Sequence, residues 1–158
     1  MTENHPANTL QELVDLPVSE FVLHRKPLLL IDRLIRLDAT SAECEWRVRK
    51  ADKFLMPGLG VPSYIGMEYM AQCISVHDGA CEYVLGFPPP LGMILGTRHL
   101  KSKVDYFDEG SAYQVACEEN VSSFDGMGSF DCSIVFNGQV VAEARLSVLK
   151  QLQRNIDG

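Results

Sequence analysis

Apolar and polar residues alternate strictly in several segments of the chain, as in strands with one face buried. In one segment Phe130, Cys132 and Ile134 occupy every second position, with polar residues between them. This period of two predicts half-buried antiparallel strands. The predicted strands cover residues 42–49, 92–103, 111–123, 127–136 and 139–149. The last two flank Asn137-Gly138, a dipeptide typical of tight β-hairpins.

A long apolar segment in the middle of the chain predicts a helix. It begins near Pro62, a residue favoured in the first helical turn, and ends near Leu85. Gly86 and the three prolines at 88–90 then stop it. Its apolar residues cover nearly every face, which predicts a buried helix. A branched, apolar run at residues 28–37 predicts one further, buried strand.

The order of these elements predicts a single α+β domain. Residues 1–20 are expected to form an extension with a short helix before Pro17, residues 21–150 the domain, and residues 151–158 a polar tail. One long helix wrapped by a curved antiparallel sheet is the layout of the hotdog fold, and other α+β rolls also fit the pattern.

Composition and charge narrow the possible functions. The 158 residues are 46% hydrophobic and 22% charged, with no apolar run long enough to span a membrane and no secretory signal. A net charge of −7 argues against nucleic-acid binding. The five widely spaced cysteines predict reduced thiols in a cytoplasmic protein. Neither a metal pattern nor a glycine-rich phosphate loop is visible.

Glu68 lies inside the apolar run of the predicted helix. A buried carboxylate costs several kcal/mol unless it is paired, hydrogen-bonded or protonated. The residue is either a satisfied structural carboxylate or a functional acid. Gln72 follows one helical turn later on the same face, where it could hold the carboxylate or pack at a dimer interface. His77 falls on the opposite face and is expected to be a core histidine.

Three segments resemble one enzyme family. Residues 24–33 (HRKPLLLIDR) are similar to the "PHRYPFLLVDR" opening of hotdog (3R)-hydroxyacyl-acyl-carrier-protein dehydratases. Residues 68–72 (EYMAQ) resemble the helix motif "EAMAQ", and residues 138–146 resemble the closing strand. The fuller run GMEYMAQCISVHDG is closer still to the dehydratase-like subunits associated with aryl-polyene pigment synthesis.

This resemblance implies a mechanism and a set of partners. Family members are dimers whose sites lie between subunits, where a histidine of one chain and a helix carboxylate of the other eliminate water from a 3-hydroxyacyl thioester. By resemblance Glu68 is the acid, and the Ser63 amide polarises the thioester carbonyl. Pro62, Gln72 and Gly96 lie on the substrate side. No added cofactor is expected, because the phosphopantetheine arm arrives on the acyl carrier protein.

The chain departs from the family at the catalytic histidine. That position falls at Leu55, and leucine cannot accept a proton. Three functions stay open: a dehydratase subunit whose histidine comes from a homologous partner, an inactive subunit that stabilises an active dehydratase, and an acyl thioesterase. His24 is a candidate substitute base. The sequence does not tell whether the dimer is homomeric or heteromeric.

Basic residues in this acidic chain form a candidate docking surface for an acidic carrier protein. An ordinary solvated strand edge explains them equally simply. They are Arg25, Lys26, Arg98, His99, Lys101 and Lys103.

Overall fold

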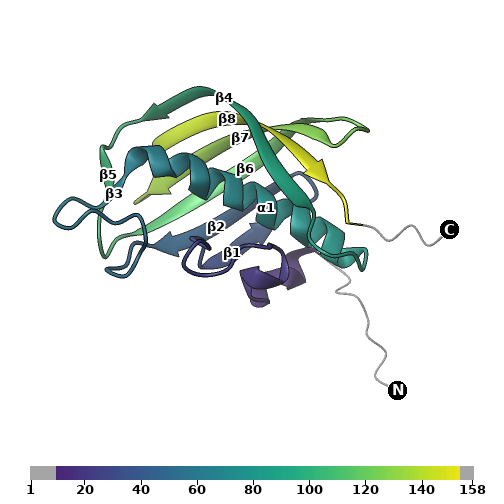
Figure 1. Ribbon diagram of the computed structural model, residues 1–158, viewed down its shortest axis with the longest axis horizontal. Helices are drawn as coiled ribbons and strands as arrows, with labels where there is room; N and C mark the ends of the chain where they lie inside the picture. The colour runs from purple at the N-terminus through teal and green to yellow at the C-terminus, as the bar shows by residue number, and fades with distance from the viewer. Residues whose placement is uncertain (1–9, 154–158) are drawn as a thin grey trace, which may run out of the picture.

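A computed structural model describes residues 10–153, which fold into one curved antiparallel sheet with a long helix, α1 (Gly66–Val84), lying across it (Figure 1). The six strands run in the order β1-β2-β6-β7-β8-β4. They span Arg33–Leu37 (β1), Ser41–Arg47 (β2), Leu91–Ser102 (β4), Ala112–Ser122 (β6), Met127–Phe136 (β7) and Gln139–Gln151 (β8). A two-stranded sheet pairs Val61–Pro62 (β3) with Tyr106–Phe107 (β5). The predicted α+β hotdog layout is confirmed.

The hairpin between β7 and β8 forms where the sequence predicted it. Asn137 and Gly138 both have positive φ, 49° and 78°, as a type I′ turn requires. Phe136 pairs with Gln139 across this turn, so the turn sets the register of β7 against β8.

The helix also ends as predicted. Gly86 takes a left-handed conformation (φ 82°), its amide donates to the Tyr83 carbonyl, and the Phe87 amide donates to the Glu82 carbonyl. These two bonds are those of a Schellman cap, which satisfies the last carbonyls of the helix. The chain therefore leaves α1 at a defined point and returns as β4.

Aromatic packing fixes the helix on the sheet. Trp46 of β2 stacks on Tyr69 of α1 with ring centroids 3.9 Å apart, and Phe107 meets both rings edge to face. All three side chains are buried. Because Tyr69 directly follows Glu68, this packing places the neighbouring carboxylate about 100° around the helix from the aromatic cluster.

The structure corrects some predicted boundaries. The strand predicted over 28–37 starts only at Arg33, and the helix predicted from Pro62 begins with a 3₁₀ turn, η3 (Ser63–Ile65). The short helix predicted before Pro17 is present as the 3₁₀ helix η1 (Leu10–Asp15), followed by η2 (Val18–Glu20). Residues 1–9 and 154–158 lie outside the described range, and the predicted domain limits stay a prediction.

Strand β4 forms one edge of the sheet. It pairs with β8 on one side only, and most of its residues are exposed. Four large apolar side chains on it are exposed: Leu91, Met93, Leu95 and Leu100. A long, apolar, unpaired edge is a surface on which another chain can pair.

Within residues 10–153, none of the helices combines the length and the apolar character needed to cross a membrane.

Candidate functional site

Glu68 lies in the first turn of α1, and its side chain is 41% exposed in the single chain. The expectation of a carboxylate buried on all sides was therefore wrong for the chain alone. One stripe of the helix, which includes Met67, Glu68, Ala71 and Ser75, is only half covered. The sequence suggested burial because the helix is apolar on nearly every face, including this open one.

Gln72 holds Glu68 in place. Its Nε2 donates to Glu68 Oε1 (3.0 Å) and to the Leu28 carbonyl (2.8 Å), and its Oε1 accepts from the Leu30 amide (2.8 Å). The Gln72 side chain is fully buried, so these bonds are shielded from water. Of the two roles left open for Gln72, the structure supports the one of fixing the carboxylate.

His24 faces the same carboxylate from the loop before β1. Its Nε2 lies 3.9 Å from Glu68 Oε1, and its side chain is 36% exposed. The other ring nitrogen, Nδ1, is buried without a hydrogen-bond partner among the described residues. Arg25 braces this loop by donating to the Val22 and His24 carbonyls, which leaves its guanidinium less available for docking a partner.

A cavity of about 120 Å³ connects these groups. It lies between α1, the start of β4 and the end of β8, and is lined by His24, Glu68, Ala71, Ile74, Ser75, Asp78, Gly92, Met93, Ile94, Val148 and Lys150. A second cavity, of about 270 Å³, adjoins it and shares His24, Ser75 and Gly92. Only the first of the two cavities is lined by Glu68.

Three residues predicted on the substrate side do not line this cavity, and their role stays a prediction. The Ser63 amide donates to the Asp105 carbonyl (2.9 Å), so this amide is not free to polarise a thioester. Pro62 is buried and pairs with Tyr106 between β3 and β5. Gly96 is exposed on β4 opposite Ser147 and does not line the cavity. The pairing of β3 with β5 fixes both Ser63 and Pro62 in these positions.

Leu55, at the position of the family histidine, packs partly buried against the core. The structure thus gives this position a packing role.

His77 is a core histidine, as expected. Its Nδ1 lies 3.2 Å from Asp78 Oδ1 and its Nε2 lies 3.2 Å from the Ala39 carbonyl, so both ring nitrogens face acceptors. Burial lowers the pKa of His77, but the bond with Asp78 and the sulfur of Cys81 outweigh it and raise this pKa to about 11. The imidazolium form therefore fits its surroundings.

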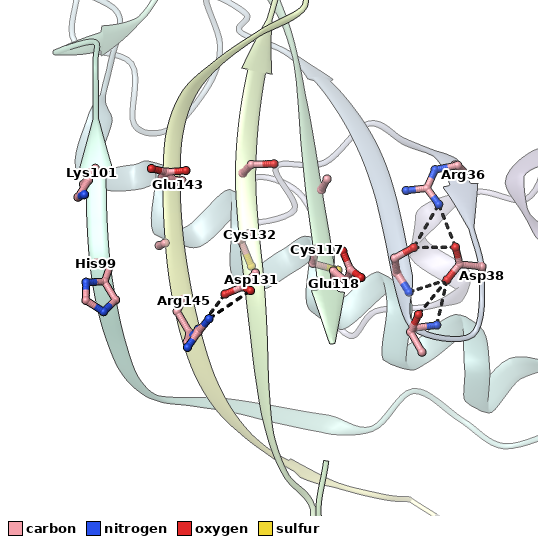
Figure 2. Close-up of a pocket in the computed structure, with 15 residues that line it drawn as sticks. Arg36, Asp38, His99, Lys101, Cys117, Glu118, Asp131, Cys132, Glu143 and Arg145 are labelled. Carbon is pink, nitrogen blue, oxygen red and sulfur yellow. Dashed lines mark hydrogen bonds and ion pairs between the residues drawn. The ribbon is translucent and has the colours of Figure 1, made fainter. Parts of the chain in front are cut away.

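A larger hollow, of about 760 Å³, lies on the face of the sheet turned away from α1. Figure 2 shows Arg145 on β8 reaching Asp131 on β7, with His99 and Lys101 on β4 beside them. The Asp131–Arg145 pair is 2.8 Å apart and Arg36–Asp38 is 3.0 Å apart. The first pair joins β7 to β8, and the second joins two residues at the end of β1. Because these charges are already paired, the hollow has the character of a solvated sheet face, and it lies apart from Glu68.

The cysteines do not contribute to the site. Cys44, Cys73, Cys117 and Cys132 are buried free thiols, and burial raises the pKa of Cys132. A raised pKa disfavours the thiolate that a nucleophile needs. Within the described range, no group of three or more His, Cys, Asp or Glu side chains could hold a metal ion.

Sequence reasoning missed part of the cavity wall. Ser75 and Asp78 are seven and ten residues after Glu68, which places them near the same face of a 3.6-residue helix. That spacing could have identified them. Nothing in the sequence could have identified Lys150, because its contact with Asp78 joins β8 to α1 across 72 positions.

The fold and the helix carboxylate are those of a hotdog protein, and a family match gives the type. Residues 16–156 match the ApeP-like family, described as ApeP dehydratase. The chain belongs to this family, and its function is dehydratase-like.

Solved structures agree with this assignment. A chain of the ApeI:P dehydratase heterocomplex from Xenorhabdus doucetiae is 26% identical and superposes with a TM-score of 0.82 over 87% of this chain and 93% of that chain. The PaaI protein of E. coli, from the phenylacetic acid degradation operon, is 14% identical with a TM-score of 0.56, over 73% and 80% of the two chains. The latter likeness shows the fold alone. No curated protein matches the sequence.

Proposed function

We propose that this chain is the carboxylate-bearing subunit of a 3-hydroxyacyl thioester dehydratase that acts in polyene-type synthesis. The observation that carries the proposal is Glu68. The buried Gln72 side chain donates a hydrogen bond of 3.0 Å to the Glu68 carboxylate, and the Glu68 side chain also faces a cavity beside the helix. A purely structural carboxylate has no need of a fixed orientation toward an open cavity.

The chemistry requires two groups. A base removes a proton from C2 of the thioester, the C2–C3 double bond forms, and the C3–O bond breaks as the protonated Glu68 carboxyl gives its proton to the leaving hydroxyl. The products are an enoyl thioester and water. Glu68 supports the acid role because its position is fixed, as general acid catalysis demands.

The base comes from a partner subunit. Leu55 packs against the core at the position where the family places its histidine. The matched complex from Xenorhabdus doucetiae is a dehydratase heterocomplex, which supports a related hotdog subunit as the partner of this chain. The exposed apolar edge of β4 and the half-covered stripe of α1 are surfaces that such a subunit would bury.

The substrate is held on an acyl carrier protein. Arg98, Lys101 and Lys103 lie on or next to the exposed edge strand, in a chain with a net charge of −7. An acidic carrier would be steered toward this local basic surface. Its phosphopantetheine arm would bring the thioester to Glu68, and no further cofactor is needed.

The closeness of His24 to Glu68 favours a second arrangement, in which this chain supplies both the acid and the base. His24 and Glu68 line one cavity, with Nε2 and Oε1 3.9 Å apart. An imidazole and a carboxylate are thus within reach of the same substrate. In this arrangement His24 takes the C2 proton.

Turnover by the purified chain, alone and with a histidine-bearing hotdog partner, tests the proposal. The substrate is a 3-hydroxyacyl chain on a carrier protein, and loss of water is followed by mass spectrometry. Dehydration only in the presence of the partner is expected. Dehydration by the chain alone, lost in His24→Ala, would establish the second arrangement. Hydrolysis of the thioester without dehydration would contradict both and indicate a thioesterase.

A further inference from the structure

One of the five free thiols differs from the other four in its surroundings. Four are buried, whereas Cys81, in the last turn of α1, is partly exposed. Cys81 follows Glu68 by thirteen positions, which is about 1300° of helical rotation and places it about 220° around the helix. Cys81 does not line the cavity at Glu68. Its chemistry is therefore separate from the candidate dehydratase site.

Cys81 lies at one end of a row of three side chains. Its Sγ is 3.8 Å from Nε2 of His77, one helical turn earlier, and His77 Nδ1 is 3.2 Å from Asp78 Oδ1. Lys150 Nζ reaches the same carboxylate oxygen at 3.3 Å, which anchors Asp78 to β8. His77 and Asp78 are only 2% and 5% exposed, so the imidazole is held in a fixed orientation. A thiol, an imidazole and a carboxylate in this order are the arrangement that activates a cysteine nucleophile.

The imidazole of His77 fits the protonated form, with a proton on each ring nitrogen. Besides the Cys81 sulfur, Nε2 faces the Ala39 carbonyl at 3.2 Å, so both nitrogens point at acceptors. The raised pKa of His77, about 11, agrees with an imidazolium at neutral pH. A positive N–H group beside a sulfur stabilises the thiolate, which is the form that attacks electrophiles.

The surroundings of Cys81 suit a small electrophile. The residue is partly covered, and it lines none of the three cavities described above. A bulky disulfide or an acyl thioester would have no pocket there. A hydroperoxide needs room for two oxygen atoms only, and it is the oxidant that converts a thiolate into a sulfenic acid.

We propose that Cys81 is a peroxide-reactive thiol, activated by His77 and Asp78, at which this chain is oxidised to a sulfenic acid. The thiolate sulfur attacks one oxygen of hydrogen peroxide, and the S–O bond forms as the O–O bond breaks. His77 Nε2 gives its proton to the departing hydroxide, which leaves as water, and His77 then regains from solvent the proton that the thiol had released. One thiol and one hydrogen peroxide thus give one sulfenic acid and one water, with the sulfur oxidised and the peroxide reduced.

Oxidation of the purified chain by hydrogen peroxide at neutral pH tests the proposal. The sulfenic acid is trapped with dimedone, and peptide mass spectrometry identifies the labelled cysteine and follows its rate. We expect Cys81 to be labelled first, and at least about tenfold faster in the native protein than in the urea-unfolded chain, where only a few per cent of the thiol is ionised. A thiol that is merely accessible reacts faster after unfolding. That result would overturn the proposal.

Variants separate activation of the thiol from its exposure. His77→Gln should slow the labelling of Cys81 about tenfold, whereas His99→Gln, the same change at an exposed position of β4, should leave the rate unchanged. Asp78→Asn should also slow it, because the amide no longer fixes the imidazolium. Circular dichroism establishes that each variant is folded, and the comparison of native with unfolded wild type decides the case if one is not. Labelling of folded His77→Gln at the wild-type rate, or first labelling of another cysteine, would contradict the role of Cys81.

Discussion

Gln72 Nε2 donates a hydrogen bond to Glu68 Oε1 across 3.0 Å, one helical turn along α1. The same side chain also bonds the Leu28 carbonyl and the Leu30 amide in the segment before β1. Gln72 thus joins the orientation of the acid to the position of the loop that carries His24. The two halves of the candidate site depend on one buried amide.

Replacing this amide should cost stability as well as activity. In Gln72→Leu, the Leu28 carbonyl and the Leu30 amide lose their partner, and each unsatisfied buried group costs about 1–3 kcal/mol. We expect the free energy of unfolding, measured by urea denaturation, to fall by at least about 2 kcal/mol. Gln114→Leu, the same change on the exposed face of β6, should stay within about 0.5 kcal/mol of wild type. Equal stability of the two variants would contradict the bridging role.

At Gly79 the helix α1 lies directly against the backbone of the N-terminal segment. A Cβ on Gly79 would lie 1.7 Å from the Phe21 carbonyl oxygen, so Gly79→Ala must push the helix away from η2. A loss of about 1–3 kcal/mol or more is expected in thermal or urea unfolding. Gly96→Ala is the control, because nothing lies within 4 Å of its Cβ position. A Gly79→Ala protein as stable as the control would refute this packing.

The His77–Asp78 pair should make stability depend on pH. The folded-state pKa of His77 is raised to about 11, above its ordinary value of about 6.5. The contribution of His77 to the free energy of unfolding is therefore complete below pH 6.5 and is lost as the pH rises toward the folded-state pKa. The stability difference between wild type and His77→Gln, from urea denaturation at a series of pH values, should be largest at pH 6 and shrink on raising the pH. A difference that grows with pH would contradict the charged form of His77.

The edge of β4 should be an interface. Leu95 is 48% exposed on this strand, and a carboxylate there would place a charge within the buried seam of a dimer. Leu95→Asp is expected to shift the protein toward monomer in sedimentation velocity, whereas Val121→Asp, at an exposed position of β6, should leave the oligomeric state unchanged. Dimers that persist unchanged in Leu95→Asp would place the interface elsewhere.

Much of the fold was predictable because its signals are local. Alternation marks the strands, Asn137-Gly138 marks the hairpin, and Gly86 marks the end of the helix, and the structure confirms all three. The run 28–37 was extended too far as a strand. Apolar runs carry no periodicity that separates strand from loop, and here the backbone of residues 28 and 30 bonds the Gln72 side chain instead of a neighbouring strand.

The site was predictable only in part. The helical spacing placed Gln72 on the same face as Glu68 and left open whether it holds the carboxylate or packs at a dimer interface. The engagement of the Ser63 amide by Asp105 and the contact of Lys150 with Asp78 depend on long-range pairing, which no local pattern encodes. The openness of Glu68 was hidden for a different reason. An apolar helix face predicts burial, but the pattern does not tell whether the same chain or another chain covers that face.

The most direct test of the account is Glu68→Gln in the complex with the histidine-bearing partner. The substitution keeps the size of the side chain and removes its acidic proton. Dehydration of a carrier-bound 3-hydroxyacyl chain, followed by the mass of the loaded arm, should fall at least about a hundredfold. Assembly and unfolding midpoint should stay as in wild type, because Glu68 is half exposed. Full dehydration activity in an assembled Glu68→Gln complex would contradict the central claim that this chain supplies the acid.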